Sequence, residues 1–284
     1  MNQTTLAFFI QLSRPRFWSY LAGPFSIGFL ASIESFSQLS SFTFWGWLFF
    51  FLFPANLLLY GINDISDEDT DAFNQKKGTK EIRITFVNKT VVSRLMQILL
   101  LVFFLFGLLC TQTLLEKSVF FLFLFLTYSY SMQPFRFKAR PFIDSASNVL
   151  YLLPGIFAFV INTNQLPPLW VIIAGSCWTF SMHLFSAVPD ISADKKAGLQ
   201  TTAIFFGQKR SLLLCSILWG ITSVVFIANY SHPFSYLSLL YVLLPVYTLH
   251  FPKRIEKVYW WFPYVNTGFG ATLFFLVLLK KYLY

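Results

Sequence analysis

The sequence has few charged residues. Asp, Glu, Lys and Arg make up 12% of its 284 positions, about half of the roughly 25% that is typical of soluble domains. Hydrophobic residues account for 56% and aromatic residues for 20%. A water-soluble globule of this composition would expose large apolar patches, and a disordered chain requires low hydrophobicity. Both classes are therefore excluded, and we expect a single integral-membrane domain over residues 1–284.

Cysteine and histidine are also scarce, with three of each. Cys110, Cys177 and Cys215 lie in apolar stretches and form no C-x-x-C pair, which argues against a disulfide scaffold and a zinc site. The net charge of +9 is compatible with nucleic-acid binding, but the basic residues are spread between apolar segments. We therefore expect that the protein binds no nucleic acid and that the lipid bilayer surrounds it.

Nine segments are apolar enough to span a bilayer, which takes roughly 20 residues of helix. They cover approximately residues 17–34, 43–60, 92–112, 117–131, 145–162, 168–189, 211–230, 234–251 and 264–281. The segment at 117–131 is short, and Pro154 and Pro245 are expected to kink their helices, which neighbouring helices tolerate. The sequence predicts an all-α polytopic membrane protein with nine transmembrane helices.

The basic residues fall on alternate connections between these segments. Eighteen of the 21 Lys and Arg lie at the N-terminus or on connections that would share its side, and only Lys117, Lys280 and Lys281 lie on the other. Cytoplasmic loops carry the excess of Lys and Arg. We therefore expect the N-terminus and the long loops to be cytoplasmic, in a bacterial or archaeal-type cell membrane.

Acidic residues gather in two places. Five of the twelve acids fall between positions 64 and 71, where Asp64, Asp67 and Asp71 are spaced i, i+3, i+7 on one helical face beside Asn63. The second group begins 126 residues later with Asp190 and Asp194. Both groups follow an even-numbered span, so they are expected to emerge on the same side of the membrane.

Clustered carboxylates repel one another unless a cation holds them. Oxygen ligands without His or Cys favour Mg²⁺, which also binds substrate phosphates. Arg14, Arg136 and Lys138 lie near the same loops and are expected to clamp a polyanion. The alternative interpretation is that each acidic run is only a solvated end of a membrane helix. Two such groups on one side favour a metal-dependent site.

These residues resemble motifs of the UbiA-type intramembrane prenyltransferases. The segment YGINDISDEDTD at 60–71 resembles the family's N-D-x-x-D-x-x-x-D motif, and DISADKKAG at 190–198 resembles its D-x-x-x-D motif. YSMQPFRFK at 130–138 resembles the Y-S-x-P-P-x-R-x-K loop, with Gln133 in place of the first proline, and residues 14–15 match the R-P that opens the first helix. Within the superfamily the chain is most similar to the lycopene elongase branch.

The resemblance implies nine helices around a central cavity with cytoplasmic cap loops. It also implies Mg²⁺-dependent transfer of a prenyl group from an allylic polyprenyl diphosphate to a lipophilic acceptor such as lycopene. The catalytic acids it implies are Asp67, Asp71, Asp190 and Asp194. The metal-binding residues it implies are Asn63, Asp64, Asp67, Asp71, Asp190 and Asp194. The diphosphate-binding residues it implies are Arg14, Asn63, Arg136 and Lys138, with Lys77 and Lys195 as further candidates.

Some candidates have a second interpretation. Lys77 and Lys195 are as well explained as topology anchors on the cytoplasmic side. Asp144 follows the Arg136 loop closely and is expected to orient it through an ion pair. His183 lies seven residues before Asp190, about two helical turns along the chain. A hydrogen-bonded packing role and a role as a base near the acceptor both remain open for it.

A secondary transporter or an anion-binding membrane protein is the main alternative in function. Transporters of this kind contain inverted repeats and place charged groups near the middle of the bilayer. Here nearly every ionisable residue lies outside the apolar segments, which favours the enzyme.

Overall fold

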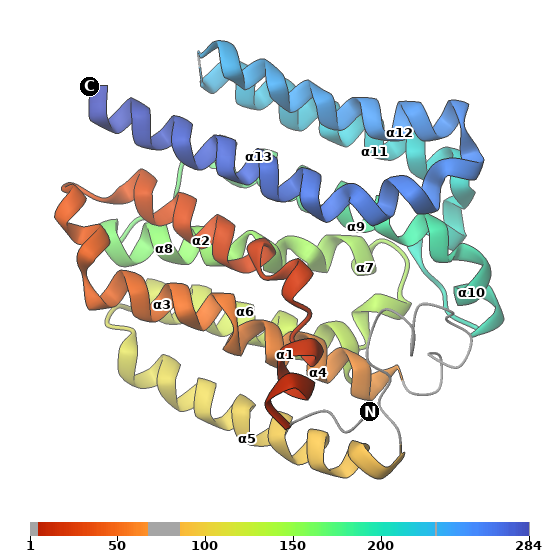
Figure 1. Ribbon diagram of the computed structural model, residues 1–284, viewed down its shortest axis with the longest axis horizontal. Helices are drawn as coiled ribbons and strands as arrows, with labels where there is room; N and C mark the ends of the chain where they lie inside the picture. Colours follow the sequence, from red (N-terminus) through yellow and green to blue (C-terminus); the bar gives the residue numbers. More distant parts are fainter. Residues whose placement is uncertain (1–4, 68–85, 231, 284) are drawn as a thin grey trace. The chain divides into compact units, whose positions relative to one another are not determined.

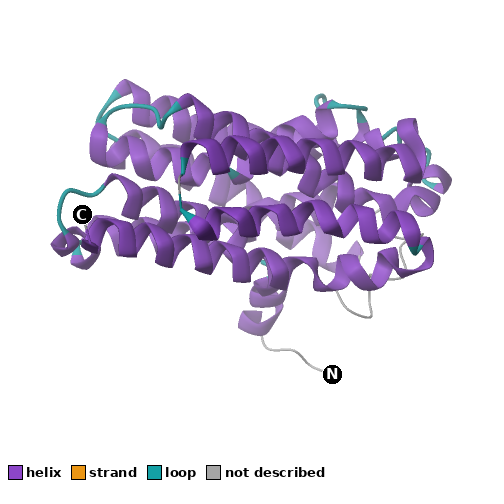
Figure 2. Ribbon diagram, turned by 90° about the horizontal axis from the view of Figure 1, so that it is seen from above, coloured by secondary structure: helices purple, strands orange, loops and turns teal. Residues whose placement is uncertain are grey.

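The computed structural model describes residues 5–67, 86–230 and 232–283. Within these ranges the chain consists of helices joined by turns and loops, with no strand (Figure 2), so the expected all-α class is confirmed. The chain divides into two compact units. Unit 1 comprises Met1–Phe135, Leu153–Leu166 and Val265–Tyr284, and unit 2 comprises Arg136–Leu152 and Pro167–Tyr264.

Unit 1 is a bundle in which α2 packs against α3 and α8, while α6 packs against α4, α5 and α8 (Figure 1). The short N-terminal helix α1 lies against α4. The helices of this unit are α1 (Thr5–Leu12), α2 (Ser19–Ser32), α3 (Phe42–Leu52), α4 (Pro54–Ser66), α5 (Phe86–Cys110), α6 (Leu114–Ser131), α8 (Leu153–Thr163) and the later part of α13 (Ile255–Leu283).

A proline separates α3 from α4. Pro54 occupies the first turn of α4, where its missing N–H costs nothing, but the break frees carbonyl groups at the end of α3. The side chain of the buried Asn56 donates to the carbonyls of Phe51 and Leu52, at 2.8 and 3.0 Å. This satisfies backbone acceptors that an apolar environment would otherwise leave without a donor, so the two helices continue as one apolar stretch.

Aromatic side chains fill the core of unit 1. The Trp47 ring lies 4.5 Å from the ring of Phe157 and 5.4 Å from that of Phe120, and the rings of Phe51 and Phe123 are 5.5 Å apart. All five are buried. Aromatic pairs at such distances contribute beyond the area that they bury, so phenylalanine here serves packing within the bundle as well as contact with lipid.

Two glycines let α2 and α8 approach closely. A Cβ atom on Gly28 would lie 2.1 Å from the carbonyl oxygen of Gly155, and one on Gly155 would lie 2.9 Å from that of Pro24. Neither position has room for a side chain. Small residues at a helix crossing permit this approach, which is typical of membrane helices.

Unit 2 is built around α9 (Leu169–Ala187), which packs against α11 (Thr202–Asn229). In Figure 1, α11 and α12 (Leu240–His250) run side by side, and they are in contact. Its other elements are the 3-10 turn η4 (Phe137–Ala139), α7 (Ile143–Ala146), η5 (Ser147–Tyr151), η6 (Val188–Asp190), α10 (Ile191–Lys196), η7 (Pro233–Leu239), η8 (Pro252–Arg254) and the beginning of α13.

The described helices suit a membrane, although the expected number of spans is not confirmed. Five stretches are long and apolar enough to cross a bilayer, and the bent pair Ile143–Tyr151 and Leu153–Thr163 raises the number to six. Each of the nine expected segments falls on described helical structure. However, α2 has 14 residues and α12 has 11, which is fewer than a perpendicular span requires.

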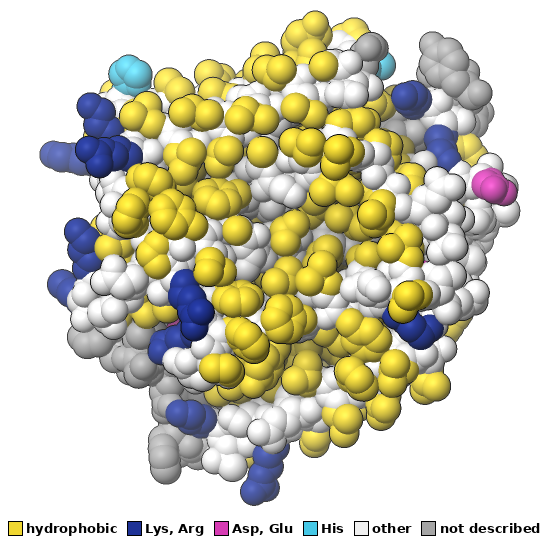
Figure 3. Space-filling view, turned by 180° about the vertical axis from the view of Figure 1, so that it is seen from behind, with side chains coloured by type: hydrophobic (Ala, Val, Ile, Leu, Met, Phe, Trp, Pro, Cys, Tyr) yellow, Lys and Arg dark blue, Asp and Glu magenta, His cyan; other side chains and the backbone are white. Residues whose placement is uncertain are grey.

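The surface is rich in apolar side chains. In the face shown in Figure 3, hydrophobic side chains predominate over the middle, and most Lys and Arg lie toward the edges. Trp45 and Phe49 on α3 are exposed, as are Leu101, Leu105 and Leu109, which are four residues apart along α5. An exposed apolar stripe at helical spacing is what lipid contact requires, so these helices are suited to face the bilayer.

Candidate active site

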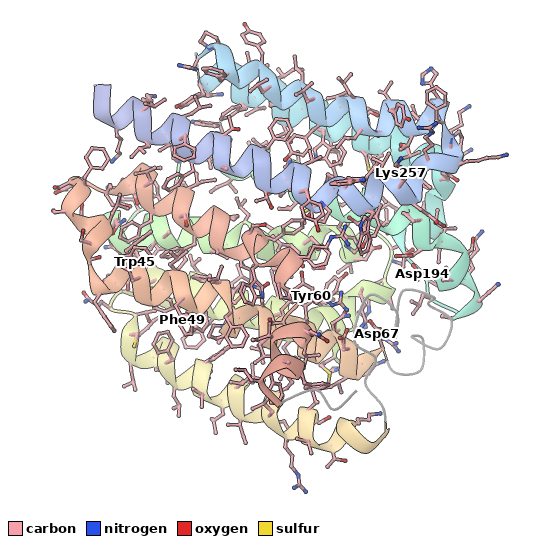
Figure 4. All side chains as sticks on the ribbon, in the orientation of Figure 1. Trp45, Phe49, Tyr60, Asp67, Asp194 and Lys257 are labelled. Carbon is pink, nitrogen blue, oxygen red and sulfur yellow. The ribbon has the colours of Figure 1, made fainter. Side chains whose placement is uncertain are left out.

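The C-terminal end of α4 carries the described part of the first acidic motif. Asp64 is in the last turn of α4, and Asp67 is the residue that ends the helix (Figure 4). Asp64 is buried, with 1% of its surface exposed. Asp71 and Lys77 lie outside the described residues, so their predicted roles stay predictions.

Arg14 is the partner of Asp64. The Nη2 atom of Arg14 lies 2.6 Å from Oδ1 of Asp64, across 50 residues of sequence. The backbone of Arg14 is left-handed, with φ of 50°, and Pro15 follows as the start of the 3-10 turn η1 (Pro15–Phe17). Its guanidinium carbon also lies 4.8 Å from the centre of the Tyr60 ring. The turn after α1 thus aims a cation at the end of α4, where carboxylate and aromatic ring both attract it.

Asn63 and Asp67 are held by side-chain hydrogen bonds. Asn63 Nδ2 donates to Asp67 Oδ2 at 3.0 Å, and the hydroxyl of Ser131 donates to Asn63 Oδ1 at 3.1 Å. Ser131 ends α6, so this chain of contacts joins two helices. Asn63 and Asp67 were predicted from the sequence but Ser131 was not, although its place beside Tyr130 in the basic loop motif was a usable signal.

The second acidic motif lies in unit 2. Asp190 ends η6 and directly precedes α10, and Asp194 lies within α10 (Figure 4). Both acids are partly exposed, and Lys195 is exposed in the last turn of α10. Gly198 ends this segment with a positive φ of 72°, a conformation that glycine adopts without steric cost. The helix turn therefore places the two carboxylates about one turn apart.

The basic loop precedes α7 in the same unit. Arg136 has a left-handed φ of 39° and caps η4, and Lys138 lies within η4 with only 8% of its surface exposed. Lysine is rarely buried to this extent without a partner. Neither Arg136 nor Lys138 is without an interaction in the structure. Arg136, Lys138, Asp190 and Asp194 thus belong to one unit, whereas Arg14, Asn63, Asp64 and Asp67 belong to the other.

Asp144 was expected to form an ion pair with the Arg136 loop, but its side chain contacts other residues. Its fully buried carboxylate accepts from the backbone N of Thr202 at 2.8 Å, from the Thr202 hydroxyl and from the backbone N of Ser145 at 2.7 Å. Oδ2 also lies 3.8 Å from Nε2 of His183. Thr202 begins α11, so Asp144 caps that helix and compensates its charge with the helix N-terminus.

Thr202 is a polar residue of this region that was not predicted from the sequence. Its hydroxyl also accepts from the backbone N of Phe142, at 2.7 Å, where φ is 69°. The sequence does suggest a helix start here, because Thr201 and Thr202 directly precede an apolar run, as helix-capping residues do. Thr201 is indeed the N-cap, accepting from the backbone N of Ile204.

The donor chemistry at both acidic motifs suits Mg²⁺. Among the described residues, no three His, Cys, Asp or Glu side chains gather into a metal site. Mg²⁺, however, is commonly bound through one or two carboxylates, with water and substrate phosphates as the other ligands. The carboxylates at the end of α4 and around α10 meet that requirement.

The UbiA prenyltransferase family profile matches residues 18–279. The lycopene elongase/hydratase of Haloarcula japonica is 35% identical over 284 residues, covering 100% of this chain and 95% of its own length. The lycopene elongase/hydratase of Haloferax volcanii is 36% identical over 275 residues, covering 94% of this chain and 87% of its own. The chain therefore belongs to the UbiA prenyltransferase family, and it is an integral membrane prenyltransferase.

Solved structures confirm the fold at lower identity. A UbiA homologue from Archaeoglobus fulgidus, bound to DMAPP and Mg²⁺, has a TM-score of 0.67 at 20% identity and covers 95% of this chain and 98% of its own. A structure of digeranylgeranylglyceryl phosphate synthase has a TM-score of 0.68 at 18% identity, with 97% and 99% covered.

Proposed function

We propose that this enzyme transfers a prenyl group from an allylic polyprenyl diphosphate to a lipophilic acceptor within the membrane, with Mg²⁺ as cofactor. The observation that carries the reaction class is the polar end of α4, where Asp64 and Asp67 lie beside Arg14 on an otherwise apolar helix. The acceptor is a carotenoid such as lycopene, as the names of the haloarchaeal relatives support.

The donor's diphosphate is the polar part of the substrate, and the charged residues take it. Asn63, Asp64, Asp67 and Asp71 would hold one Mg²⁺, and Asp190 with Asp194 would hold another. Bound Mg²⁺ neutralises the charge that builds on the departing diphosphate. The direct ligands of the diphosphate are proposed to be Arg14, Asn63, Arg136 and Lys138, with Lys77 and Lys195 at the edge.

The protein's part in the reaction is to hold charge in place before the bond breaks. Fixed donors aimed at a leaving group stabilise it without reorganisation at the moment of reaction. Arg14 can take this role because its guanidinium has five N–H donors and its Nη2 lies 2.6 Å from Oδ1 of Asp64, which holds the cation at the end of α4. Apolar helices around the site exclude water from the allylic cation.

We further propose that the whole chain acts as one catalytic domain, since the family profile spans 18–279. The N-terminus and both acidic motifs would face the cytoplasm, where soluble diphosphates are found. The distribution of Lys and Arg along the sequence supports this orientation.

The test uses the full chain in lipid nanodiscs with lycopene, Mg²⁺ and either DMAPP or GPP. Mass spectrometry should detect acceptor heavier by whole prenyl groups, together with released diphosphate. Asp67→Asn and Asp190→Asn should each lower both signals by at least about 100-fold, and chelating the metal should abolish them. The matched control is Glu256→Gln, which changes an exposed acid at the start of α13 and should leave activity unchanged.

Two results would contradict the proposal. Unchanged product in Asp67→Asn and Asp190→Asn would remove the acidic residues from the reaction. Uptake of an anionic substrate into vesicles without any covalent product would instead favour the transporter. A prenylated product on a different lipid would keep the reaction class and replace the carotenoid acceptor.

A further inference from the structure

Helix α9 has two unlike faces. Phe185 is fully buried and its ring packs 5.6 Å from Trp219 and 5.2 Å from Phe262. His183 and Ala187 are partly exposed and are followed by the partly exposed Asp190, in an i, i+4, i+7 pattern. His183 therefore lies on the side that leads to Asp190, about 12 Å from it along the chain, at about 1.5 Å per residue in α9 and about 2.0 Å in η6.

The carboxylate of Asp144, which is fixed by hydrogen bonds, lies next to His183. Asp144 is locked by two hydrogen bonds from Thr202 and one from Ser145. Its Oδ2 faces His183 Nε2 at 3.8 Å. This separation suits an ion pair and is longer than a hydrogen bond, although contacts of this kind often shorten when substrate binds. One nitrogen of the imidazole thus lies beside the negative charge of Asp144, and backbone N–H groups fix the position of that carboxylate.

Proton balance requires a base in the proposed reaction, on which this inference rests. The C1–O bond of the donor breaks and the diphosphate leaves with the electron pair. The π electrons of an acceptor double bond form the new C–C bond and leave a carbocation on the acceptor. A neighbouring C–H bond then breaks, its electrons form a double bond, and the proton must go to a base. If water adds to the cation instead, the resulting oxonium loses a proton to the same base.

We propose that His183 is this general base, and that Asp144 is the residue that positions it and stabilises the imidazolium. The proton arrives at Nδ1, because Nε2 faces the carboxylate. The motif acids are assigned to the diphosphate end of the substrate. The other two histidines, His232 and His250, are exposed. His183 is thus the histidine that combines partial burial, a carboxylate partner and a place on the Asp190 side of α9.

The decisive measurement is the ratio of prenylated acceptor to released diphosphate, taken on the same sample in nanodiscs. This ratio is independent of how much protein has folded. In His183→Gln, product should fall by about 100-fold, the range of general base catalysis, while diphosphate release stays within about threefold of wild type. Without the base the acceptor cation cannot lose its proton, so the new C–C bond should break again and return the prenyl cation. Water should then capture that cation, so prenyl alcohol should account for the missing product.

Three controls separate this role from a structural one. Imidazole added to His183→Ala should raise the product-to-diphosphate ratio, which a packing defect would not allow. Asp144→Asn should lower the ratio by about tenfold, as a loss of roughly 1.4 kcal/mol. His250→Gln changes an exposed histidine at the end of α12 and should leave the ratio as in wild type.

An unchanged ratio in His183→Gln would overturn the assignment, as would a parallel fall of product and diphosphate release without imidazole rescue in His183→Ala. Absence of diphosphate release and product from the wild-type protein would instead refute the proposed function itself.

Discussion

Two buried carboxylates, one in each unit, are compensated in different ways. Asp64 faces a full positive charge, because the Arg14 guanidinium lies 2.6 Å away. Asp144 is compensated by the dipoles of the α11 N-terminus and by hydrogen bonds from Thr202 and Ser145. Both are almost fully buried, and a buried charge requires a partner of one kind or the other.

The difference indicates which carboxylate can respond to substrate. Arg14 has a long side chain, and in the proposed reaction it would exchange Asp64 for a phosphate while Asp64 would take a metal ion. The backbone N–H of Thr202 cannot leave Asp144 unless α11 unwinds. We therefore expect Asp64 to belong to the part of the site that rearranges during binding, and Asp144 to the part that stays fixed.

The largest expected effect on stability is that of Arg14→Ala. Removing one partner of a buried ion pair leaves an uncompensated charge and costs about 3–5 kcal/mol. Because Arg14 remains 16% exposed at its side chain, we expect the lower end of that range. Thermal unfolding in detergent, followed by circular dichroism, would measure the loss against wild type.

The double variant Arg14→Ala with Asp64→Asn controls for this result. It removes the stranded charge, so it should recover part of the lost stability, as coupled pairs do in a mutant cycle. If the two changes add without any recovery, Asp64 is not compensated by Arg14 in the folded protein.

A smaller loss is expected for Thr202→Val, which replaces the hydroxyl by a methyl of similar size. Two groups then lose a partner, namely the buried Asp144 carboxylate and the partly buried Phe142 N–H. Leaving buried polar groups unsatisfied costs about 1–3 kcal/mol, while the backbone bond from Thr202 to Asp144 persists. Thermal unfolding would measure it, with Thr202→Ser as the control that keeps the hydroxyl. Equal stability of the Val and Ser variants would contradict the capping role.

Local sequence pattern was enough to predict the helical class and the polar segments that contain Asp67 and Asp194. It did not predict the partners of the two buried carboxylates, Asp64 and Asp144. Arg14 and Asp64 are 50 residues apart and Asp144 and Thr202 are 58 apart. Such pairs depend on how helices pack, and hydropathy does not determine which helices touch.

The nine expected spans were not confirmed, for a related reason. Apolar windows continue through helix breaks that only geometry reveals. Pro24 lies within the short α2 and Pro245 within the short α12, and the fifth expected span at 145–162 is a bent pair of helices. The backbone then needs local partners, such as Asn56 at the α3–α4 break, and one sequence does not show which polar residues serve in this way.

The smallest effect is expected for Ser131→Ala, and it tests whether neutral hydrogen bonds prepare the first acidic motif as Thr202 prepares Asp144. The change removes one donor to Asn63, so stability should fall by about 1 kcal/mol. The Mg²⁺ concentration at half-maximal activity should rise by about threefold, since the amide that bonds Asp67 loses its support.

Ser129→Ala is the matched control on the same helix. The Ser129 hydroxyl is buried and has no hydrogen-bond partner among the described residues, so its removal should not raise the Mg²⁺ requirement. If both variants shift the Mg²⁺ dependence equally, the effect comes from α6 as a whole, and the Ser131–Asn63 contact has no special part in it.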